Sequence, residues 1–164
     1  MVSGPLRVRA SVSALVFRGD AVALVVKQDP SGVFYTLPCG GQEHGETLAD
    51  AVRREFWEEV GLPVTVGELL FVREYIGKHH EYASTDADIH VTDHIFRGYL
   101  TDESDAAIAG ATPYGRDPDQ VGVAWVPVGE LPQYRFYPRA LIGRIQAIAR
   151  DGQSPGPVYV GDVN

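Results

Sequence analysis

Three glutamates, Glu55, Glu58 and Glu59, lie close together in the segment 37–62. On a helix Glu55 would be one turn from both others, and each pair of like charges costs roughly a few tenths of a kcal/mol. The cluster would also lie near the helix C-terminus, where the macrodipole disfavours acids. A divalent cation would reverse these unfavourable terms, and carboxylate oxygens are ligands that Mg²⁺ and Mn²⁺ prefer. The spacing therefore indicates a metal site.

The apolar pattern of this segment places the glutamates beside the core. At about 100° per residue, Leu48, Val52, Phe56 and Val60 fall on one face of a helix. Glu59 falls among them, whereas a solvated acidic face would lie opposite. Because several local preferences are violated together, the pattern favours a functional site over a solvated charge run.

The spacing around the glutamates matches a known pattern. Gly40 is followed by five residues, Glu46, seven residues and then the run REFWEEVGL, which ends at Leu62. This resembles the complete Nudix box, G-x5-E-x7-R-E-U-x-E-E-x-G-U with U bulky and apolar, at every fixed position. The resemblance implies an α/β fold, a Nudix-type α/β/α sandwich with a mixed β-sheet. It also implies a hydrolase that cleaves the pyrophosphate bond of a nucleoside diphosphate linked to another moiety, by water attack at phosphorus.

The resemblance assigns roles within the box. Glu55, Glu58 and Glu59 would bind the divalent cofactor, Mg²⁺ or Mn²⁺, and Glu58 or Glu59 would also orient or deprotonate the attacking water. Arg54 would anchor the glutamates by ion pairing, and Glu46 would hold the geometry of loop and helix. These roles agree with phosphoryl chemistry, which depends mostly on positioning and charge neutralisation.

Two further positions extend the expected site. At Cys39 many family members carry a glycine whose backbone carbonyl binds metal, and a carbonyl does not depend on the side chain. A nucleophilic role for the Cys39 thiol is disfavoured, because the sequence offers no partner base. Several relatives add an acid from a later loop. Asp119 is our candidate, with Asp117 and Glu103 as rivals.

Basic and aromatic residues near the box are candidates for substrate binding. Lys27 and Tyr35 lie on expected strands close to it. The motif YRFYPR supplies Arg135 and Tyr137, which could contact phosphate and stack on a base, or else anchor the last helix. A zinc site at His90 and His94 is disfavoured, because on a strand their positions are about 13 Å apart.

The elements that must position these residues follow from apolar patterning and turn residues. The box helix is expected to start at Thr47 and to end at Gly61. We expect a single domain over residues 1–150 and a tail, 151–164, that adds an edge strand or stays apart from the sheet. The expected strands are 7–17, 21–27, 33–37, 64–76, 88–100 and 121–128, with a last helix over 138–150 and a polar connection over 77–87.

Composition limits the partners. The chain of 164 residues carries a net charge of −8, which disfavours nucleic acid and anionic membranes. A single cysteine, no apolar run long enough for a membrane span and no signal-peptide pattern predict a cytoplasmic protein. The expected partner is a nucleotide-type small molecule. A homodimer contact at Trp57 stays open, as does packing of Trp57 under a loop. A nucleotide-sensing module without hydrolysis is the main alternative function, and an isomerase on the same fold is a third.

Overall fold

A mixed β-sheet forms the centre of the protein. The computed structural model describes residues 5–101 and 117–164. Within them the strands are β1 (Arg9–Arg18), β2 (Ala21–Asp29), β3 (Gly32–Thr36), β4 (Cys39–Gly41), β5 (Val64–Ile76), β6 (His90–Leu100), β7 (Gln120–Pro127), β8 (Phe136–Tyr137) and β9 (Tyr159–Asp162). The helices are α1 (Leu48–Val60), α2 (Ala83–Asp86) and α4 (Ile142–Asp151), with 3₁₀ turns η1 (Gly77–His79), η3 (Val128–Gln133) and η4 (Arg139–Leu141).

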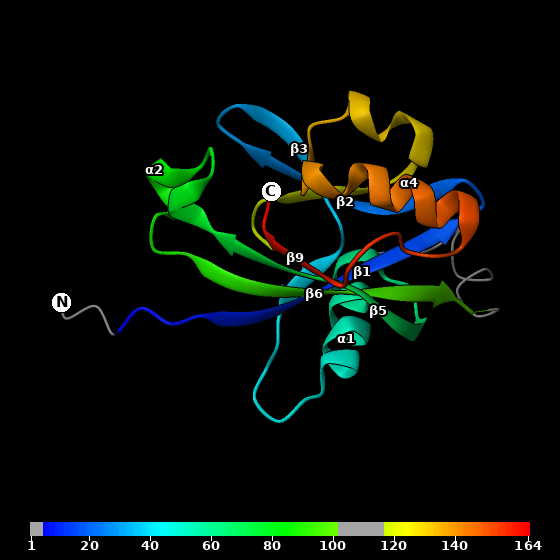
Figure 1. The fold of residues 1–164 in the computed structure, drawn as a ribbon, viewed down its shortest axis with the longest axis horizontal. Coiled ribbons are helices and arrows are strands. Elements are labelled where there is room, and N and C mark those ends of the chain that lie inside the picture. The colour runs from blue at the N-terminus through cyan, green and yellow to red at the C-terminus, as the bar shows by residue number, and fades with distance from the viewer. Residues whose placement is uncertain (1–4, 102–116) are drawn as a thin grey trace.

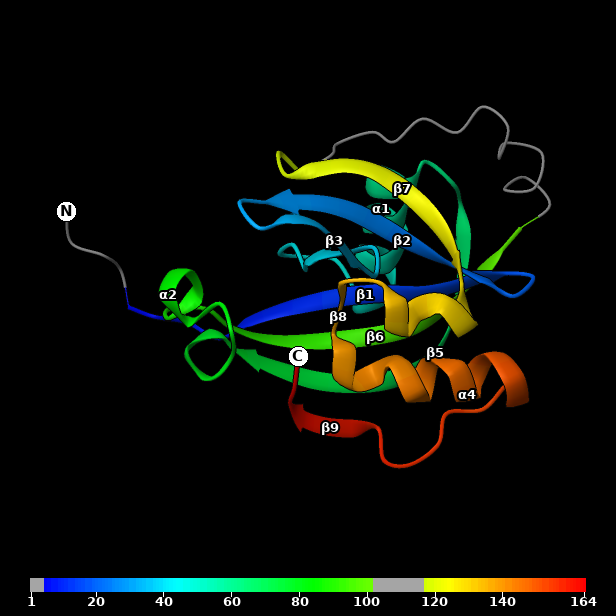
Figure 2. The same ribbon diagram turned by 90° about the horizontal axis from the view of Figure 1, so that it is seen from above.

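The sheet mixes parallel and antiparallel pairs. Its strand order is β8-β3-β2-β1-β6-β5-β9, with β4 on β1 and β7 on β2. The β1–β6, β3–β8 and β5–β9 pairs are parallel, and the other pairs are antiparallel. The expected tail strand exists as β9 at the edge of the sheet, beside β5 (Figure 2).

Helices cover both faces of the sheet. Figures 1 and 2 show α1 on one side and α4 on the other. Side chains on β1 alternate between the two layers, as the period of a strand requires. Leu15 packs in the cluster that contains Ile145 of α4, whereas Val12 and Val16 pack in the cluster that contains Phe56 of α1. The predicted α/β/α arrangement with a mixed sheet is therefore present.

The box helix has the predicted ends. Thr47 is the N-cap, and its side chain accepts the backbone N–H of Asp50 at 3.1 Å. Gly61 ends α1 in the left-handed conformation, with φ 81°, which glycine adopts at low cost. These caps fix the register of α1, so the face that carries Glu59 is turned toward the sheet.

The structure departs from the predicted elements in four places. The last helix begins at Ile142 rather than at residue 138, because Arg139–Leu141 form the 3₁₀ turn η4. The connection over 77–87 contains the short helical segments η1 and α2. The three-residue strand β4 and the two-residue strand β8 were not predicted.

Among residues 5–101 and 117–164, no helix has the length and apolar character of a membrane span.

Candidate functional site

Glu59 is a carboxyl buried between α1 and β4. Its side chain is 2% exposed. Oε2 accepts the backbone N–H of Cys39 at 2.8 Å, whereas Oε1 is buried without a hydrogen-bond partner in the described residues. Burial raises the pKa of Glu59 to about 8, and the charges of Glu55 and Asp117 add to the rise. A buried acid with one unpaired oxygen fits the donor set of a divalent cation.

Glu55 approaches the same short strand. Its carboxyl lies over Gly40, where an added Cβ would come within 2.1 Å of Glu55 Oε1. A side chain at position 40 would therefore displace the Glu55 carboxyl from this place, whereas glycine allows it. Burial raises the pKa of Glu55. Glu58, one turn further on, is more exposed, with 31% of its side-chain surface accessible.

Arg54 holds the acidic residues of the box together. Its Nη2 donates to Glu46 Oε1 at 2.6 Å and to the carbonyl of Gly41 at 2.9 Å. Its Nη1 donates to Glu55 at 2.7 Å and to Glu58 at 3.4 Å. The hydrogen bond from Arg54 lowers the pKa of Glu46. Arg54 thus joins loop to helix, which is the geometry expected for an anchoring residue.

Arg54 also determines where the carboxylates point. In the described part of the chain, no group of three His, Cys, Asp or Glu side chains is spaced to surround one ion. Glu55 and Glu58 turn toward Arg54, whereas Glu59 turns toward Cys39. Glu55 and Glu58 thus share Arg54 as a partner, whereas Glu59 is held separately by the backbone of β4.

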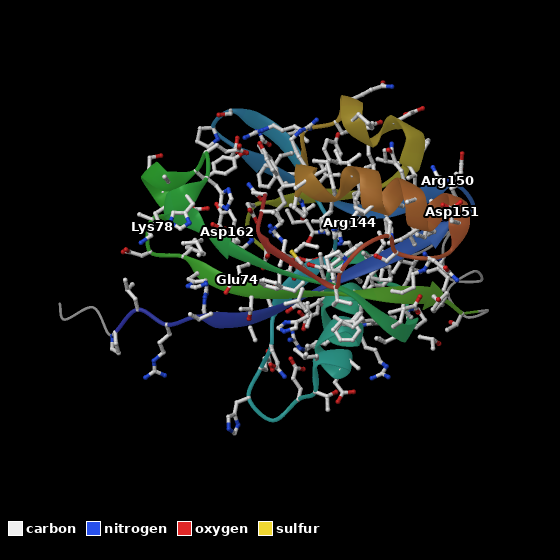
Figure 3. The ribbon with its side chains drawn as sticks, in the orientation of Figure 1. Glu74, Lys78, Arg144, Arg150, Asp151 and Asp162 are labelled. Carbon is white, nitrogen blue, oxygen red and sulfur yellow. The ribbon has the colours of Figure 1, made fainter. Side chains whose placement is uncertain are left out.

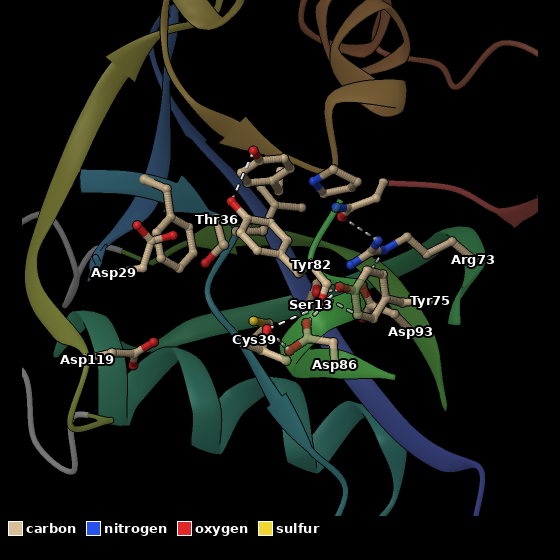
Figure 4. Close-up of a pocket in the computed structure, with 16 residues that line it drawn as sticks. Ser13, Asp29, Thr36, Cys39, Arg73, Tyr75, Tyr82, Asp86, Asp93 and Asp119 are labelled. Atoms are coloured by element: carbon tan, nitrogen blue, oxygen red, sulfur yellow. Dashed lines mark hydrogen bonds and ion pairs between the residues drawn. The ribbon is translucent and has the colours of Figure 1, made fainter. Parts of the chain in front are cut away.

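A cavity of about 370 Å³ opens beside these residues. Figure 4 shows Cys39 and Asp119 next to α1, with Asp29, Thr36 and Tyr82 farther from that helix. The described residues that line the cavity are Ser13, Asp29, Phe34, Thr36, Leu37, Cys39, Arg73, Tyr75, Tyr82, Thr85, Asp86, Asp93, Asp119, Tyr137, Pro138 and Asn164.

The candidate acids of the later loop converge on Lys27. Its Nζ lies 3.3 Å from Asp117 Oδ2 and 3.6 Å from Asp119 Oδ1. Asp119 lines the cavity, whereas the charge of Asp117 raises the pKa of both Glu55 and Glu59. Both acids are therefore near the box. Glu103 lies outside the described residues.

The four candidate substrate residues have different surroundings. Tyr137 lines the cavity. Arg135 is not among the lining residues, and it donates two hydrogen bonds, of 3.0 and 2.7 Å, to the carboxylate of Asp29. Lys27 is held by the loop acids. Tyr35 packs edge-on against Tyr134 in the core, with ring centroids 5.0 Å apart, so the structure places it away from the cavity.

A buried polar cluster at the cavity was missed by sequence reasoning. Asp93 on β6 accepts the Ser13 hydroxyl at 2.9 Å and Arg73 Nε at 3.1 Å. Asp93 is 4% exposed. Its position two residues before the buried Ile95 was the available signal, because both side chains must point to the same face of the strand.

Three histidines, His79, His80 and His94, have hydrogen-bond partners other than metal in the described residues. His79 Nδ1 and His80 Nε2 lie 2.7 and 2.6 Å from the two oxygens of Asp162, so they tie β9 to the turn that carries Lys78 (Figure 3). His94 Nδ1 lies 3.0 Å from the carbonyl of Ser11.

Comparisons with known proteins agree with the fold. A family model described as the NUDIX domain matches residues 7–142. The chain is similar to a NUDIX hydrolase from Nitrosomonas europaea (TM-score 0.68, 18% identity, covering 90% of this chain and 92% of that one). It is also similar to an ADP-ribose pyrophosphatase from Streptococcus suis (TM-score 0.62, 18% identity, 95% and 100% covered) and to a UDP-X diphosphatase (TM-score 0.64, 18% identity, 98% and 70% covered). No curated protein sequence matches the chain.

Because the family match spans most of its length, the chain belongs to the NUDIX family. Its fold is the α/β/α sandwich predicted from the sequence, and it carries every fixed residue of the box. It is a Nudix hydrolase.

Proposed function

We propose that this hydrolase cleaves the pyrophosphate bond of a nucleoside diphosphate linked to another moiety, with Mg²⁺ or Mn²⁺ as cofactor. The observation that carries the proposal is Glu59, whose unpaired Oε1 lies buried beside the cavity-lining residue Cys39. The names of two structural neighbours, an ADP-ribose pyrophosphatase and a UDP-X diphosphatase, support the same type of bond.

The residues that would hold the cation are Glu55, Glu58 and Glu59, with the backbone carbonyl of Cys39. Carboxylate and carbonyl oxygens suit a hard divalent ion. When bound, the ion shields the diphosphate charge and lowers the pKa of a coordinated water. This neutralisation explains how a chain with a net charge of −8 accepts a polyanion.

The protein's own groups supply position and proton transfer. Glu58 or Glu59 accepts a proton from the attacking water. Burial raises the pKa of Glu59 to about 8, because a buried carboxylate is disfavoured relative to its protonated form. Arg54 positions Glu55 and Glu58 through Nη1. Asp119 lines the cavity and is our choice as the additional acid, with Asp117 as its rival.

A substrate panel tests the proposal. We would incubate the protein with ADP-ribose, nucleotide sugars, nucleoside triphosphates and dinucleoside polyphosphates, in Mg²⁺, Mn²⁺ or EDTA, and follow product release. We expect turnover of at least one substrate, lost in EDTA. Glu59→Gln should lower kcat by about 10³, as expected for loss of a key charge-stabilising group. The exposed Glu130, on η3, provides the matched control Glu130→Gln, which should retain activity.

The outcomes separate the candidate functions. Full activity of Glu59→Gln would contradict the role given to this residue. Tight nucleotide binding without turnover across the panel would favour the nucleotide sensor instead.

Two further predictions concern the protein's surroundings. We propose a cytoplasmic location and a homodimer contact at Trp57, which is 49% exposed on α1 in the described structure. Sedimentation analysis of the wild-type protein and of Trp57→Ala tests the contact. A monomeric wild-type protein would contradict the proposed homodimer contact.

A further inference from the structure

The side of the cavity away from α1 is walled by aromatic rings. Phe34 comes from β3, Tyr82 from the turn before α2 and Tyr137 from β8, and all three line the cavity (Figure 4). Tyr137 meets the other two rings edge-on, with centroid distances of 6.3 Å to Phe34 and 5.7 Å to Tyr82. Such a wall offers an apolar surface on which an uncharged ring can pack.

Hydrogen bonds from behind fix this wall. Arg135, which is not among the lining residues, donates to both oxygens of Asp29 and to the hydroxyl of Tyr82. The Tyr82 hydroxyl in turn donates to that of Tyr137 at 3.1 Å. The Arg135 guanidinium also lies 5.5 Å from the centroid of the Phe34 ring. The rings are therefore held in place before any ligand arrives, which lowers the entropy cost of binding.

The cations around the site already have carboxylate partners. Arg54 binds Glu46 at 2.6 Å. Lys27 lies 3.3 Å from Asp117. The remaining two pairs are Arg73 with Asp93, at 3.1 Å, and Arg135 with Asp29, at 2.7 Å. Besides the diphosphate held at the metal site, a further phosphate would have to break one of these four pairs to reach the cations named, which belong to residues 5–101 and 117–164.

Asp86 adds a negative charge to the cavity lining. Its Oδ2 accepts the hydroxyl of Tyr75 at 2.7 Å and its Oδ1 that of Thr85 at 3.0 Å. Both partners are neutral, so they leave the charge of Asp86 uncompensated. The charges of Asp29, Asp93 and Asp119, in contrast, are each paired with a cation. A carboxylate accepts about four hydrogen bonds in all, so Asp86 can also receive ligand hydroxyl groups.

Thr36 offers a second polar contact in the lining. Its Oγ1 is buried and has no hydrogen-bond partner among the described residues. Buried hydroxyls are normally satisfied, so a ligand hydroxyl is a suitable partner for it.

From the aromatic wall, the paired cations and these two polar groups, we infer the substrate class. The cavity accepts an uncharged, hydroxyl-bearing ring, and the preferred substrate is a nucleoside diphosphate joined to a sugar rather than to a third phosphate. The inference rests on the proposed function, because the diphosphate is taken to bind at the box glutamates. Asp86 is the residue that discriminates, since it accepts bonds from sugar hydroxyls and repels phosphate.

ADP-ribose and ATP form a matched pair of probes, because both contain ADP and differ in whether a ribosyl or a phosphoryl group is attached. With Mg²⁺ we expect kcat/KM for ADP-ribose to exceed that for ATP by about tenfold or more, from the like-charge repulsion of the third phosphate. Calorimetric binding of both probes to Glu59→Gln gives the same comparison without turnover. Equal or better use of ATP, equal or tighter binding of ATP, or binding of neither probe, would overturn the inference.

These readouts separate the two levels of the argument. Cleavage of ATP but not of ADP-ribose would leave the proposed function standing and overturn the substrate class. Preferential binding of ADP-ribose without cleavage of any substrate would support the cavity assignment and contradict the proposed function.

Variants of the turn test the role of Asp86. Asp86→Asn keeps an acceptor for Tyr75 but removes the charge, so the preference for ADP-ribose over ATP should fall by about tenfold. Asp88→Asn, on the same turn but exposed and outside the lining, should leave the preference unchanged. An unchanged preference in Asp86→Asn would overturn the inference. If this variant fails to fold, as judged by its thermal midpoint, Tyr82→Ala tests the wall instead, because it removes one of the lining rings. It should lower kcat/KM for ADP-ribose more than that for ATP, and an equal effect on both substrates would overturn the inference.

Discussion

Replacing Glu59 with glutamine should stabilise the metal-free protein while it removes activity. The ordinary pKa of a glutamate is 4.5, and burial raises that of Glu59 to about 8 in the fold. Between these values the unfolded chain has released this proton and the folded chain still holds it. The free energy of unfolding therefore falls as the pH rises through this window. At about 1.4 kcal/mol per pH unit, the loss at pH 7 amounts to about 3 kcal/mol.

Glutamine at position 59 does not titrate, and its carbonyl oxygen can still accept the Cys39 N–H that Glu59 Oε2 accepts. In EDTA we therefore expect Glu59→Gln to be more stable than the parent at pH 7, by up to about 3 kcal/mol. Below pH 4.5 the difference should shrink toward zero, since the glutamate is then mostly protonated in both states. Urea denaturation across this pH range measures both values.

Addition of Mg²⁺ supplies the complementary measurement. The parent should gain stability as the cation binds the folded state, and Glu59→Gln should gain much less. If the variant is no more stable than the parent in EDTA at pH 8, the reasoning from burial is refuted. A more stable variant would show that the buried Glu59 carboxyl lowers the stability of the metal-free fold. An equally stable variant would show that it does not.

Three further predictions concern the frame of the site. Thr47→Ala removes the N-cap bond to Asp50 and should cost about 1 kcal/mol of stability by urea denaturation, with kcat retained; no loss would contradict the capping role. Gly61→Ala forces a side chain into the left-handed conformation at φ 81° and should cost about 1–2 kcal/mol, measured in the same way; an unchanged free energy of unfolding would contradict strain at this position. Asp93→Ala leaves Arg73 without its partner at 3.1 Å and should lower stability by about 3 kcal/mol, seen as a drop in the thermal midpoint; a midpoint within error of the parent's would argue against this pair.

The box helix could be predicted because its determinants are local. Thr47 and Gly61 specify the ends of α1, and the apolar period between them specifies which face packs on the sheet. The burial of Glu59 follows directly from that period. The relation of Arg54 to Glu55 and Glu58 follows from helical spacing and from the family pattern.

The cavity could not be predicted because its lining comes from strands far apart in the sequence. Alternation on β3 implies that Phe34 and Tyr35 face opposite sides, but the sequence does not say which side borders a cavity. Which side borders the cavity depends on the two-residue strand β8, which pairs with β3 although the two are far apart in the sequence. Sequence reasoning chose Tyr35, whereas the structure places Phe34 in the lining.

Cys39 has a practical consequence. It is the single cysteine of the chain, it lines the cavity, and its backbone N–H binds Glu59. Burial raises the pKa of its thiol far above the ordinary value, and the charge of Glu59 adds to the rise. Since the thiolate is the reactive species, iodoacetamide should modify the native protein very slowly and the unfolded chain readily. The rate of alkylation at this one atom therefore distinguishes native from unfolded protein, and the wild-type chain provides the probe without an engineered label.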